Sequence, residues 1–407
     1  MTNVSRRGFL AGASASAGAL VGAAAGGLIG SQLGSDSATA AAELKAQTAV
    51  LKRKEPFTGA HQNGIELELQ TFTNFVSLDL LAGADKAAML RWMTLLTDDI
   101  ARLTQGDPTL ADAQPQLALG PARLTVTVGF GPALFSKLGL EHQLPESFKD
   151  LPAFKVDALK PEFSSGDVLL HVSADDPIVL SHAVRRLITD SMAFASVRWS
   201  QQGFSNAQGV VPHGVRQRNL MGQVDGTDNP AFNTNDFDNL VWIQDGPSWI
   251  QGGTLLVFRR IAMQLNTWDQ LGRIDKEQVI GRRLDNGAPL GKNNELDPPD
   301  FDARDTNGLK VIPDFAHIRR AHATNPGERF FRRPFNYEVG MTADGNPDVG
   351  LLWTAYQKNL DTQFIPVQRR LDQFDLLNKW TSPIGSAVFA IAKGVRSGEV
   401  LAAELFA

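Results

Sequence analysis

The chain has 407 residues, of which 43% are hydrophobic and 20% are charged, as in a globular protein of about two domains. Its formal net charge of −5 argues against a nucleic-acid-binding surface, which would need clustered Lys and Arg. The absence of cysteine excludes disulfides, iron–sulfur clusters, cysteine-bound zinc and thiolate ligands to iron.

The N-terminus has the features of an export signal. Arg6 and Arg7 form a twin-arginine pair, a weakly hydrophobic run rich in Ala and Gly covers 11–33, and small residues at 38–42 offer cleavage sites. A membrane anchor is the alternative, but the Ala and Gly content makes this run a poor membrane-spanning helix. We expect a twin-arginine signal peptide over 1–42 and a polar linker over 43–55. Export would place the protein in the periplasm, outside the cell or at its surface.

Hydrophobic periodicity predicts the elements of a first domain over 56–218. Helical spacing predicts helices over 85–103 and 176–192. Alternating apolar residues predict strands over 66–72 and 122–130, and strands are also predicted over 167–173 and 194–200. The order strand, helix, strand, strand, helix, strand is that of the ferredoxin-like fold. This part of the chain is therefore expected to be an α+β domain.

A second domain is expected over 219–407. Strands are predicted over 248–260, 350–357 and 387–391, and helices over 261–271, 275–281 and 364–377. Residues 285–308 are rich in Asp, Asn, Pro and Gly, which predicts a long loop. Long loops without secondary structure often have a functional role.

The stretch 219–230, with the sequence NLMGQVDGTDNP, is the most informative in the chain. It places Asp225 between Gly222 and Gly226. Glycine allows close approaches that a Cβ would block, so the acid could lie against a flat ligand. The alternative is an ordinary Asp-Gly hairpin turn, and these residues taken alone favour the turn.

The string Gly222-x-x-Asp225-Gly226-Thr227 closely resembles the signature of the dye-decolorising peroxidases. Further segments resemble that family in the same order, at 57–65, 317–319, 330–337, 355–360, 364–371, 376–380 and 385–390. The resemblance covers about residues 56–407 and is closest to the exported, twin-arginine branch. It implies two ferredoxin-like domains with antiparallel sheets flanked by helices, arranged like a dimeric α+β barrel. The second domain would bind haem, and Asp225 would lie over the distal face of a b-type haem.

The resemblance places the iron ligand at His317, which begins the string His317-Ile318-Arg319. His322 is the rival, and without the resemblance both would be surface histidines in a basic stretch. Arg319 or Arg320 is expected to pair with a haem propionate, since a guanidinium matches a carboxylate. Asp375 is the candidate to accept a hydrogen bond from His317, although Lys379 stands where many members carry an acid.

The distal arginine of the family falls on Arg332, the first of the pair Arg332-Arg333. Pro334 follows where the family usually has glycine, so Arg333 stays open as the alternative. An arginine pair beside several Phe residues is expected to be partly buried rather than fully exposed.

The resemblance implies a haem-dependent peroxidase that reduces hydrogen peroxide and oxidises dyes or phenols through an oxo-ferryl intermediate. Its cofactor would be haem b, iron protoporphyrin IX. Asp225 and Arg332 would be catalytic and His317 would bind the metal, with Gly226, Thr227, Arg319 and Arg332 against the cofactor. The alternative is an exported, deferrochelatase-like protein that handles haem iron for an iron-uptake system. Partners would be peroxide, small aromatic reductants and the twin-arginine machinery, without nucleic acid, and an oligomer is compatible with the sequence.

Overall fold

The computed structural model describes residues 52–118, 120–212 and 215–407. The signal peptide expected over 1–42 and most of the linker over 43–55 therefore lie outside the described residues. In the part of the chain that is described, no helix has the length and apolar character needed to cross a membrane.

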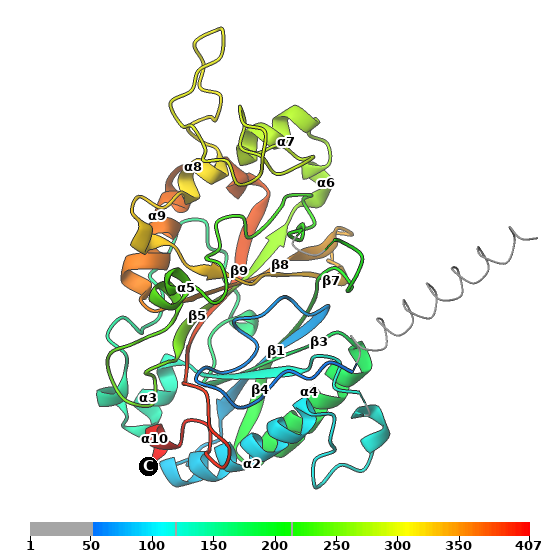
Figure 1. The fold of residues 1–407 in the computed structure, drawn as a ribbon, viewed down its shortest axis with the longest axis vertical. Coiled ribbons are helices and arrows are strands. Elements are labelled where there is room, and N and C mark those ends of the chain that lie inside the picture. Colours follow the sequence, from blue (N-terminus) through cyan, green and yellow to red (C-terminus); the bar gives the residue numbers. More distant parts are fainter. Residues whose placement is uncertain (1–51, 119, 213–214) are drawn as a thin grey trace, which may run out of the picture. The chain divides into compact units, whose positions relative to one another are not determined.

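The N-terminal half contains an antiparallel sheet in the order β2-β3-β1-β4 (Figure 1). Along the chain β1, α2, β2, β3, α4 and β4 follow one another, which confirms the expected ferredoxin-like order. The strands are β1 (Phe72–Leu80), β2 (Thr125–Phe130), β3 (Val168–Ala174) and β4 (Ala195–Phe204). The helices are α2 (Lys86–Thr104), α3 (Pro132–Leu138) and α4 (Pro177–Ser191).

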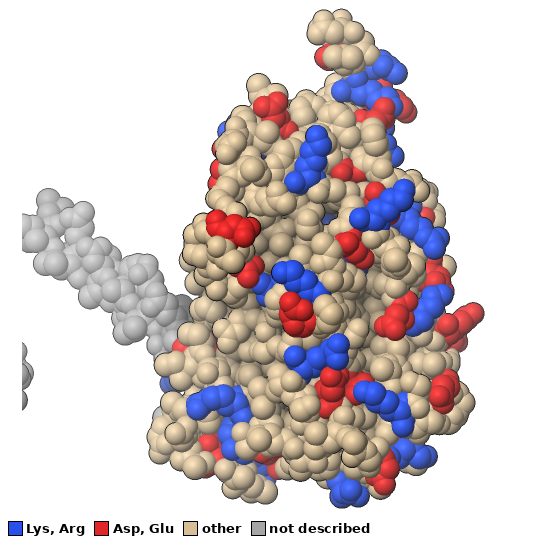
Figure 2. Space-filling view, turned by 180° about the vertical axis from the view of Figure 1, so that it is seen from behind, with Lys and Arg blue, Asp and Glu red and all other residues tan. Residues whose placement is uncertain are grey.

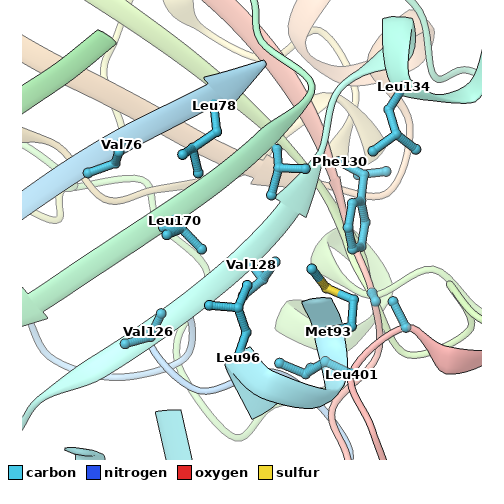
Figure 3. Packing of buried hydrophobic residues seen from close by; sticks show 14 of the residues in the cluster. Val76, Leu78, Met93, Leu96, Val126, Val128, Phe130, Leu134, Leu170 and Leu401 are labelled. Atoms are coloured by element: carbon cyan, nitrogen blue, oxygen red, sulfur yellow. The ribbon is translucent and has the colours of Figure 1, made fainter. Parts of the chain in front are cut away.

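The two long helices of this half cover the outer face of its sheet. Each begins at an aspartate whose carboxylate accepts backbone N–H groups of the first turn, Asp85 for α2 and Asp176 for α4. Apolar residues of α2, such as Met93 and Leu96, pack against alternate residues of the strands, such as Val126 and Val128 (Figure 3). This face of the sheet is therefore filled by a helix.

The C-terminal half repeats the same strand order. Its sheet runs β9-β5-β8-β7, and β6 adds to the edge of β8. The strands are β5 (Thr254–Met263), β6 (Phe331–Arg332), β7 (Phe335–Met341), β8 (Pro347–Gln357) and β9 (Thr381–Ile391). The helices are α5 (Asn235–Val241), α6 (Leu265–Trp268), α7 (Arg273–Ile280), α8 (His317–Ala321), α9 (Ile365–Phe374) and α10 (Ala403–Phe406).

The two sheets join at both edges and close a barrel. β2 pairs with β9 at Gly129 and Phe130, and β4 pairs with β7 at Phe204. Because β5 pairs with both β8 and β9, the ring β5-β9-β2-β3-β1-β4-β7-β8 returns to its start. Aromatic side chains from both sheets, including Phe75, Phe258 and Tyr356, fill the interior. The barrel-like α+β architecture expected from the sequence is thereby confirmed.

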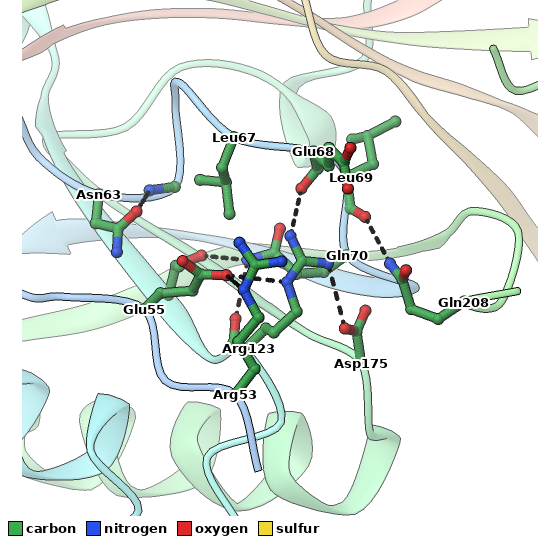
Figure 4. Close-up of polar contacts among 12 residues, drawn as sticks. Arg53, Glu55, Asn63, Leu67, Glu68, Leu69, Gln70, Arg123, Asp175 and Gln208 are labelled. Carbon is green, nitrogen blue, oxygen red and sulfur yellow. Dashed lines mark hydrogen bonds and ion pairs between the residues drawn. The ribbon is translucent and has the colours of Figure 1, made fainter. Parts of the chain in front are cut away.

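The strand predicted over 66–72 is wrong, since the first strand begins only at Phe72. Two buried arginines explain the difference, Arg123, which is labelled in Figure 4, and Arg333. Arg123 Nη2 donates to the carbonyl of Glu68 at 3.0 Å, and Arg333 Nη1 donates to that of Leu67 at 2.5 Å. Guanidinium groups thus bind carbonyls that a strand would offer to its neighbour.

The helix predicted over 261–271 is also shorter than expected. β5 continues to Met263, which pairs with Thr381 of β9, and only Leu265–Trp268 is helical. The long loop expected over 285–308 is confirmed, since no named helix or strand lies within it. On the surface, charges of both signs are interspersed over the face in Figure 2.

Candidate active site

A cavity of about 520 Å³ lies on the outer face of the C-terminal sheet. Its floor is formed by alternate residues of β5 and β8, including Ile261, Met263, Leu351 and Trp353. The intervening residues of the same strands face the barrel interior, as the pleat requires. The walls come from the loop 219–228, the loop 295–299, α8 and α9.

His317 lies in the cavity wall at the first position of α8. Its Nδ1 is 2.6 Å from Oδ2 of Asp375, the residue that ends α9, and Asp375 Oδ1 accepts the N–H of Leu377 at 2.9 Å. Burial lowers the pKa of the His317 imidazole, but the charge and hydrogen bond of Asp375 raise it more, so the net pKa lies above its ordinary value. The ring is thus oriented by Asp375, which leaves Nε2 as the nitrogen available to a ligand.

The other end of α8 is also held by α9. Arg370 Nε donates to the carbonyl of Arg320 at 3.3 Å, and Arg370 Nη2 donates to that of His322 at 3.0 Å. Arg370 Nη2 also contacts Glu328 Oε2 at 2.8 Å. A cation at the C-terminal end of a helix donates hydrogen bonds to the last carbonyls and interacts favourably with the helix dipole. One helix therefore fixes both ends of the segment that carries His317.

His322 also lines the cavity, but its surroundings differ from those of His317. Its side chain is exposed, and its ring packs edge-on to Phe301 at a centroid distance of 5.0 Å. The buried carboxylate of Asp375 contacts His317 instead. The geometry therefore favours His317 as the ligand.

Asp225 and Arg332 meet at the cavity wall. Arg332 Nη1 lies 3.7 Å from Asp225 Oδ1, close enough for an ion pair but too far for a hydrogen bond. Asp225 Oδ1 is buried and has no hydrogen-bond partner among the described residues. Both charges act on the pKa of His317, so the three side chains share one electrostatic environment.

Strand alternation separates Arg332 from Arg333. Arg332 faces the cavity, whereas Arg333 is 1% exposed and donates to Leu67 O and Gln70 Oε1 on the N-terminal side of the barrel. Burial lowers the pKa of Arg333 to about 10. Of the two arginines left open by the sequence, Arg332 is the one at the cavity.

Arg319 does not line the cavity. Its Nη2 donates to the carbonyls of Phe301 at 2.5 Å and Ile312 at 2.6 Å, and its Nε donates to that of Pro313 at 3.1 Å. The guanidinium thus holds the long loop against α8, and a contact of Arg319 with a propionate has no support. Among the other candidates, Thr227 lines the cavity, while Gly226 is not among the lining residues and lies in a turn at φ 88°.

Two further residues of the site were not singled out from the sequence. Glu295 Oε1 accepts the hydroxyl of Thr227 at 2.9 Å and Arg216 Nη1 at 3.0 Å, which ties the long loop to the Asp225 loop. Asn229 bonds to the backbone of Arg332. The position of Asn229 beside the Asp-Gly motif could have identified it as a site residue from the sequence. Glu295 stands in a loop with several other acidic residues, and its neighbours in the sequence do not distinguish it from them.

The donor set of the cavity fits haem. The described residues contain no group of three or more His, Asp or Glu able to hold a metal ion by themselves. The free Nε2 of His317 in a largely apolar cavity instead suits an iron that arrives with porphyrin ligands of its own. Asp225, whose Oδ1 has no hydrogen-bond partner among the described residues, and Arg332 line the cavity that such a group would fill.

Known proteins support this assignment. The family model of the Dyp-type peroxidase N-terminal domain matches residues 62–205, and that of the C-terminal domain matches residues 216–396. The dye-decolorizing peroxidase of Thermobifida fusca (strain YX) is 41% identical over 98% of this chain and 97% of its own length. The deferrochelatase of Escherichia coli (strain K12) is 34% identical over 84% of this chain and 85% of its own length.

Solved structures agree with the sequence matches. The DyP-type peroxidase from Cellulomonas bogoriensis is 48% identical, with a TM-score of 0.85 over 88% of this chain and 99% of that one. Ferric DtpA from Streptomyces lividans is 38% identical, also with a TM-score of 0.85, over 88% of this chain and 98% of that one. The chain therefore belongs to the Dyp-type peroxidase family, whose members are haem-dependent enzymes that reduce peroxide and oxidise dyes or other reductants.

Proposed function

We propose that the protein is an exported peroxidase that binds haem b through His317 and cleaves hydrogen peroxide with Asp225 and Arg332. The observation that carries the proposal is the shared cavity. It brings the imidazole oriented by Asp375 together with the carboxylate of Asp225, whose Oδ1 lacks a hydrogen-bond partner among the described residues, and the guanidinium of Arg332. A bound haem would supply the iron that binds peroxide, and it would accept the oxidising equivalents of the peroxide.

His317 would bind the iron through Nε2. Its Nδ1–H would donate to Asp375, which increases the electron density that the imidazole gives to the metal. The side chain of Asp375 is only 2% exposed, so water does not compete for this hydrogen bond. Arg370 and Asp375 on α9 would keep the ligand in place during turnover.

Asp225 would move the proton between the two oxygen atoms of peroxide. A carboxylate can act as general base toward the inner oxygen and then as general acid toward the leaving oxygen. Asp225 lines the cavity, and its buried Oδ1 has no hydrogen-bond partner among the described residues, so no protein donor holds that oxygen. A guanidinium group carries a positive charge and is not a proton acceptor, so Arg332 would stabilise negative charge without taking the proton.

Peroxide-dependent dye oxidation by the haem-loaded protein tests this function. We expect a Soret band and turnover that depends on both peroxide and reductant. Protein that carries haem yet oxidises no dye or phenol with peroxide would contradict the proposal.

Haem-iron handling is a second candidate, because relatives 34–36% identical bear the name deferrochelatase. The Asp225–Arg332 pair favours the peroxidase, since haem carriage alone needs neither residue. Quantifying iron-free porphyrin released from added haem, beside peroxide turnover, separates the two activities. Porphyrin release without turnover would favour the second candidate.

Export through the twin-arginine pathway is part of the proposal and rests on Arg6 and Arg7. This route carries folded proteins, so the chain could load haem before leaving the cytoplasm. The double substitution Arg6→Lys and Arg7→Lys should leave uncleaved precursor in the cytoplasm. Undiminished export of this variant would point to the general secretory route.

A further inference from the structure

We propose that Asn229 is a positioning residue that fixes Arg332 relative to Asp225. The inference rests on the roles proposed above for that pair. Asn229 stands four residues after Asp225 on the same loop and contacts the strand that carries Arg332. Its side chain would act on peroxide cleavage only through the placement of these two residues.

The side-chain amide of Asn229 forms a reciprocal pair of hydrogen bonds with one residue. Its Nδ2 donates to the carbonyl of Arg332 at 2.7 Å, and the backbone N–H of Arg332 donates to its Oδ1 at 3.0 Å. A neighbouring antiparallel strand would supply the same two hydrogen bonds, one to the carbonyl and one from the N–H of Arg332. The amide therefore takes the place of a strand along the free side of β6.

This side of β6 would otherwise be open. β6 contains only Phe331 and Arg332 and forms the edge of the sheet beside β8. The next N–H, that of Arg333, points the opposite way and donates to Thr354 of β8 at 3.0 Å. Because strand N–H groups alternate in direction, the N–H and carbonyl of Arg332 need a partner from outside the sheet.

A tight turn connects this amide to Asp225. The backbone N–H of Asn229 donates to the carbonyl of Gly226 at 3.0 Å, and Arg216 Nε donates to the same carbonyl at 3.2 Å. Gly226 has φ 88°, and a Cβ built there would lie 3.2 Å from Asn229 Nδ2. Glycine thus allows the turn that brings the amide against Arg332.

The two distal side chains do not fix each other. Arg332 Nη1 and Asp225 Oδ1 are 3.7 Å apart, beyond hydrogen-bonding distance, so their separation depends on the two backbones. Misplacement of a reacting group by about 1 Å can cost about 10²-fold in rate. The amide of Asn229 belongs to the loop that carries Asp225 and forms hydrogen bonds with the backbone of Arg332. It can therefore affect the rate of peroxide cleavage by setting the separation of the two side chains.

The substitutions Asn229→Leu and Asn229→Asp separate the two bonds. Leucine has a similar size but forms neither bond, whereas aspartate keeps the acceptor and loses the donor. In the haem-loaded protein we expect Asn229→Leu to slow the reaction with peroxide about 10- to 10²-fold. The rate constant for the reductant should stay unchanged, and Asn229→Asp should show an intermediate loss.

Hydrogen exchange gives a readout independent of activity. The amide of Arg332 should lose protection in Asn229→Leu, in both the haem-free and haem-loaded protein, as measured on a peptide covering 329–334. Asn266→Leu is the matched control, because Asn266 is an exposed amide whose Nδ2 contacts Asn346 Oδ1 at 2.5 Å, outside the residues that line the cavity. It should change neither the exchange nor the peroxide rate.

A double-mutant cycle separates positioning from general destabilisation. If Asn229 acts through Arg332, Asn229→Leu should cause little further loss in an Arg332→Leu background. Losses that multiply in the double variant, or unchanged exchange and rate in Asn229→Leu, would overturn the proposal. If Arg332→Leu itself has the normal rate, the proposed role of Arg332 fails, while the exchange data still decide whether Asn229 holds its backbone. If Asn229→Leu does not fold, Asn229→Asp carries the same comparisons.

Discussion

The two halves of the molecule share a strand order but use the outer faces of their sheets differently. In the N-terminal half, β1 is connected to β2 by α2, whose apolar side packs on the sheet. In the C-terminal half, the corresponding connection runs from β5 to β7 through short helices, a long loop and α8. The cavity lies on the outer face of this second sheet, bounded by parts of that connection.

The difference shows how one topology supports both a core and a site. A long amphipathic helix fills the space above a sheet with apolar side chains and leaves no room for a ligand. A longer and more polar connection forms walls instead and brings His317 and Glu295 to the cavity. Substitutions in the C-terminal half should therefore affect chemistry most, and those in the N-terminal half should affect stability.

The largest effect is expected for His317→Ala, which removes the proposed iron ligand from the cavity wall. The variant should lose most of its haem and its peroxidase activity, while its secondary structure remains. The Soret absorbance per protein and a haemin titration of the haem-free protein measure this loss. His322→Ala is the matched control, and a reversal of the two results would make His322 the ligand.

Asp225→Asn should keep haem but lose the proton-accepting carboxylate. We expect the reaction with peroxide to slow by about 10²–10⁴-fold, the range for a positioned acid–base group. Rapid mixing with peroxide measures the rate, and Asp238→Asn is the control, because Asp238 is exposed on α5 and does not line the cavity. A normal rate for Asp225→Asn together with a large loss for Arg332→Leu would assign the proton transfer to another group.

Leu96→Ala tests the filled face of the N-terminal sheet. Leu96 is 0% exposed on α2 and packs in the apolar cluster of Figure 3. The cavity left behind should lower the free energy of unfolding by about 2–5 kcal/mol, as measured by denaturant titration. The haem spectrum and peroxide rate of the folded variant should not change. A parallel loss of activity would mean that the two halves are coupled more closely than the comparison implies.

The smallest effect is expected for Asp99→Asn and depends on pH. Asp99 of α2 is 4% exposed, and burial followed by its hydrogen bond to Asp190 raises its pKa from 3.8 to about 7, with Arg186 opposing the shift. The folded state therefore holds a proton that the unfolded state releases, so stability falls as pH rises from about 4 to about 7.

The neutral amide introduced by Asp99→Asn would imitate the protonated acid and remove that penalty. We expect the substitution to stabilise the protein by on the order of 2 kcal/mol at pH 8 and to have little effect near pH 4. Thermal unfolding at the two pH values measures the difference. An equal shift at both would contradict the assignment of the proton to Asp99.

Local pattern was sufficient for most of the fold. The period of apolar residues in 85–103 and 176–192 located both long helices of the first half to within a residue or two. Alternation located β2, the strands predicted over 167–173 and 350–357 correspond to β3 and β8, and the order of elements gave the ferredoxin-like topology. The helices were located because their amphipathic period reflects the face that each of them buries.

What only the tertiary structure decided concerns partners far apart in sequence. The residues 66–72 alternate as a strand would, but Arg123 and Arg333 bind their carbonyls. Arg319 stands in the motif, yet the carbonyls of the long loop hold it outside the cavity.

The sequence by itself determined the family, because the motifs that identify it are contiguous. The export signal over 1–42 and the site residues that the sequence proposed stay predictions. The tertiary structure decided between Arg332 and Arg333, oriented His317 with Asp375, and joined Asn229 to Arg332. These choices depend on which hydrogen-bonding groups the closed barrel and its covering segments bring within about 3 Å, a distance that a linear sequence does not contain.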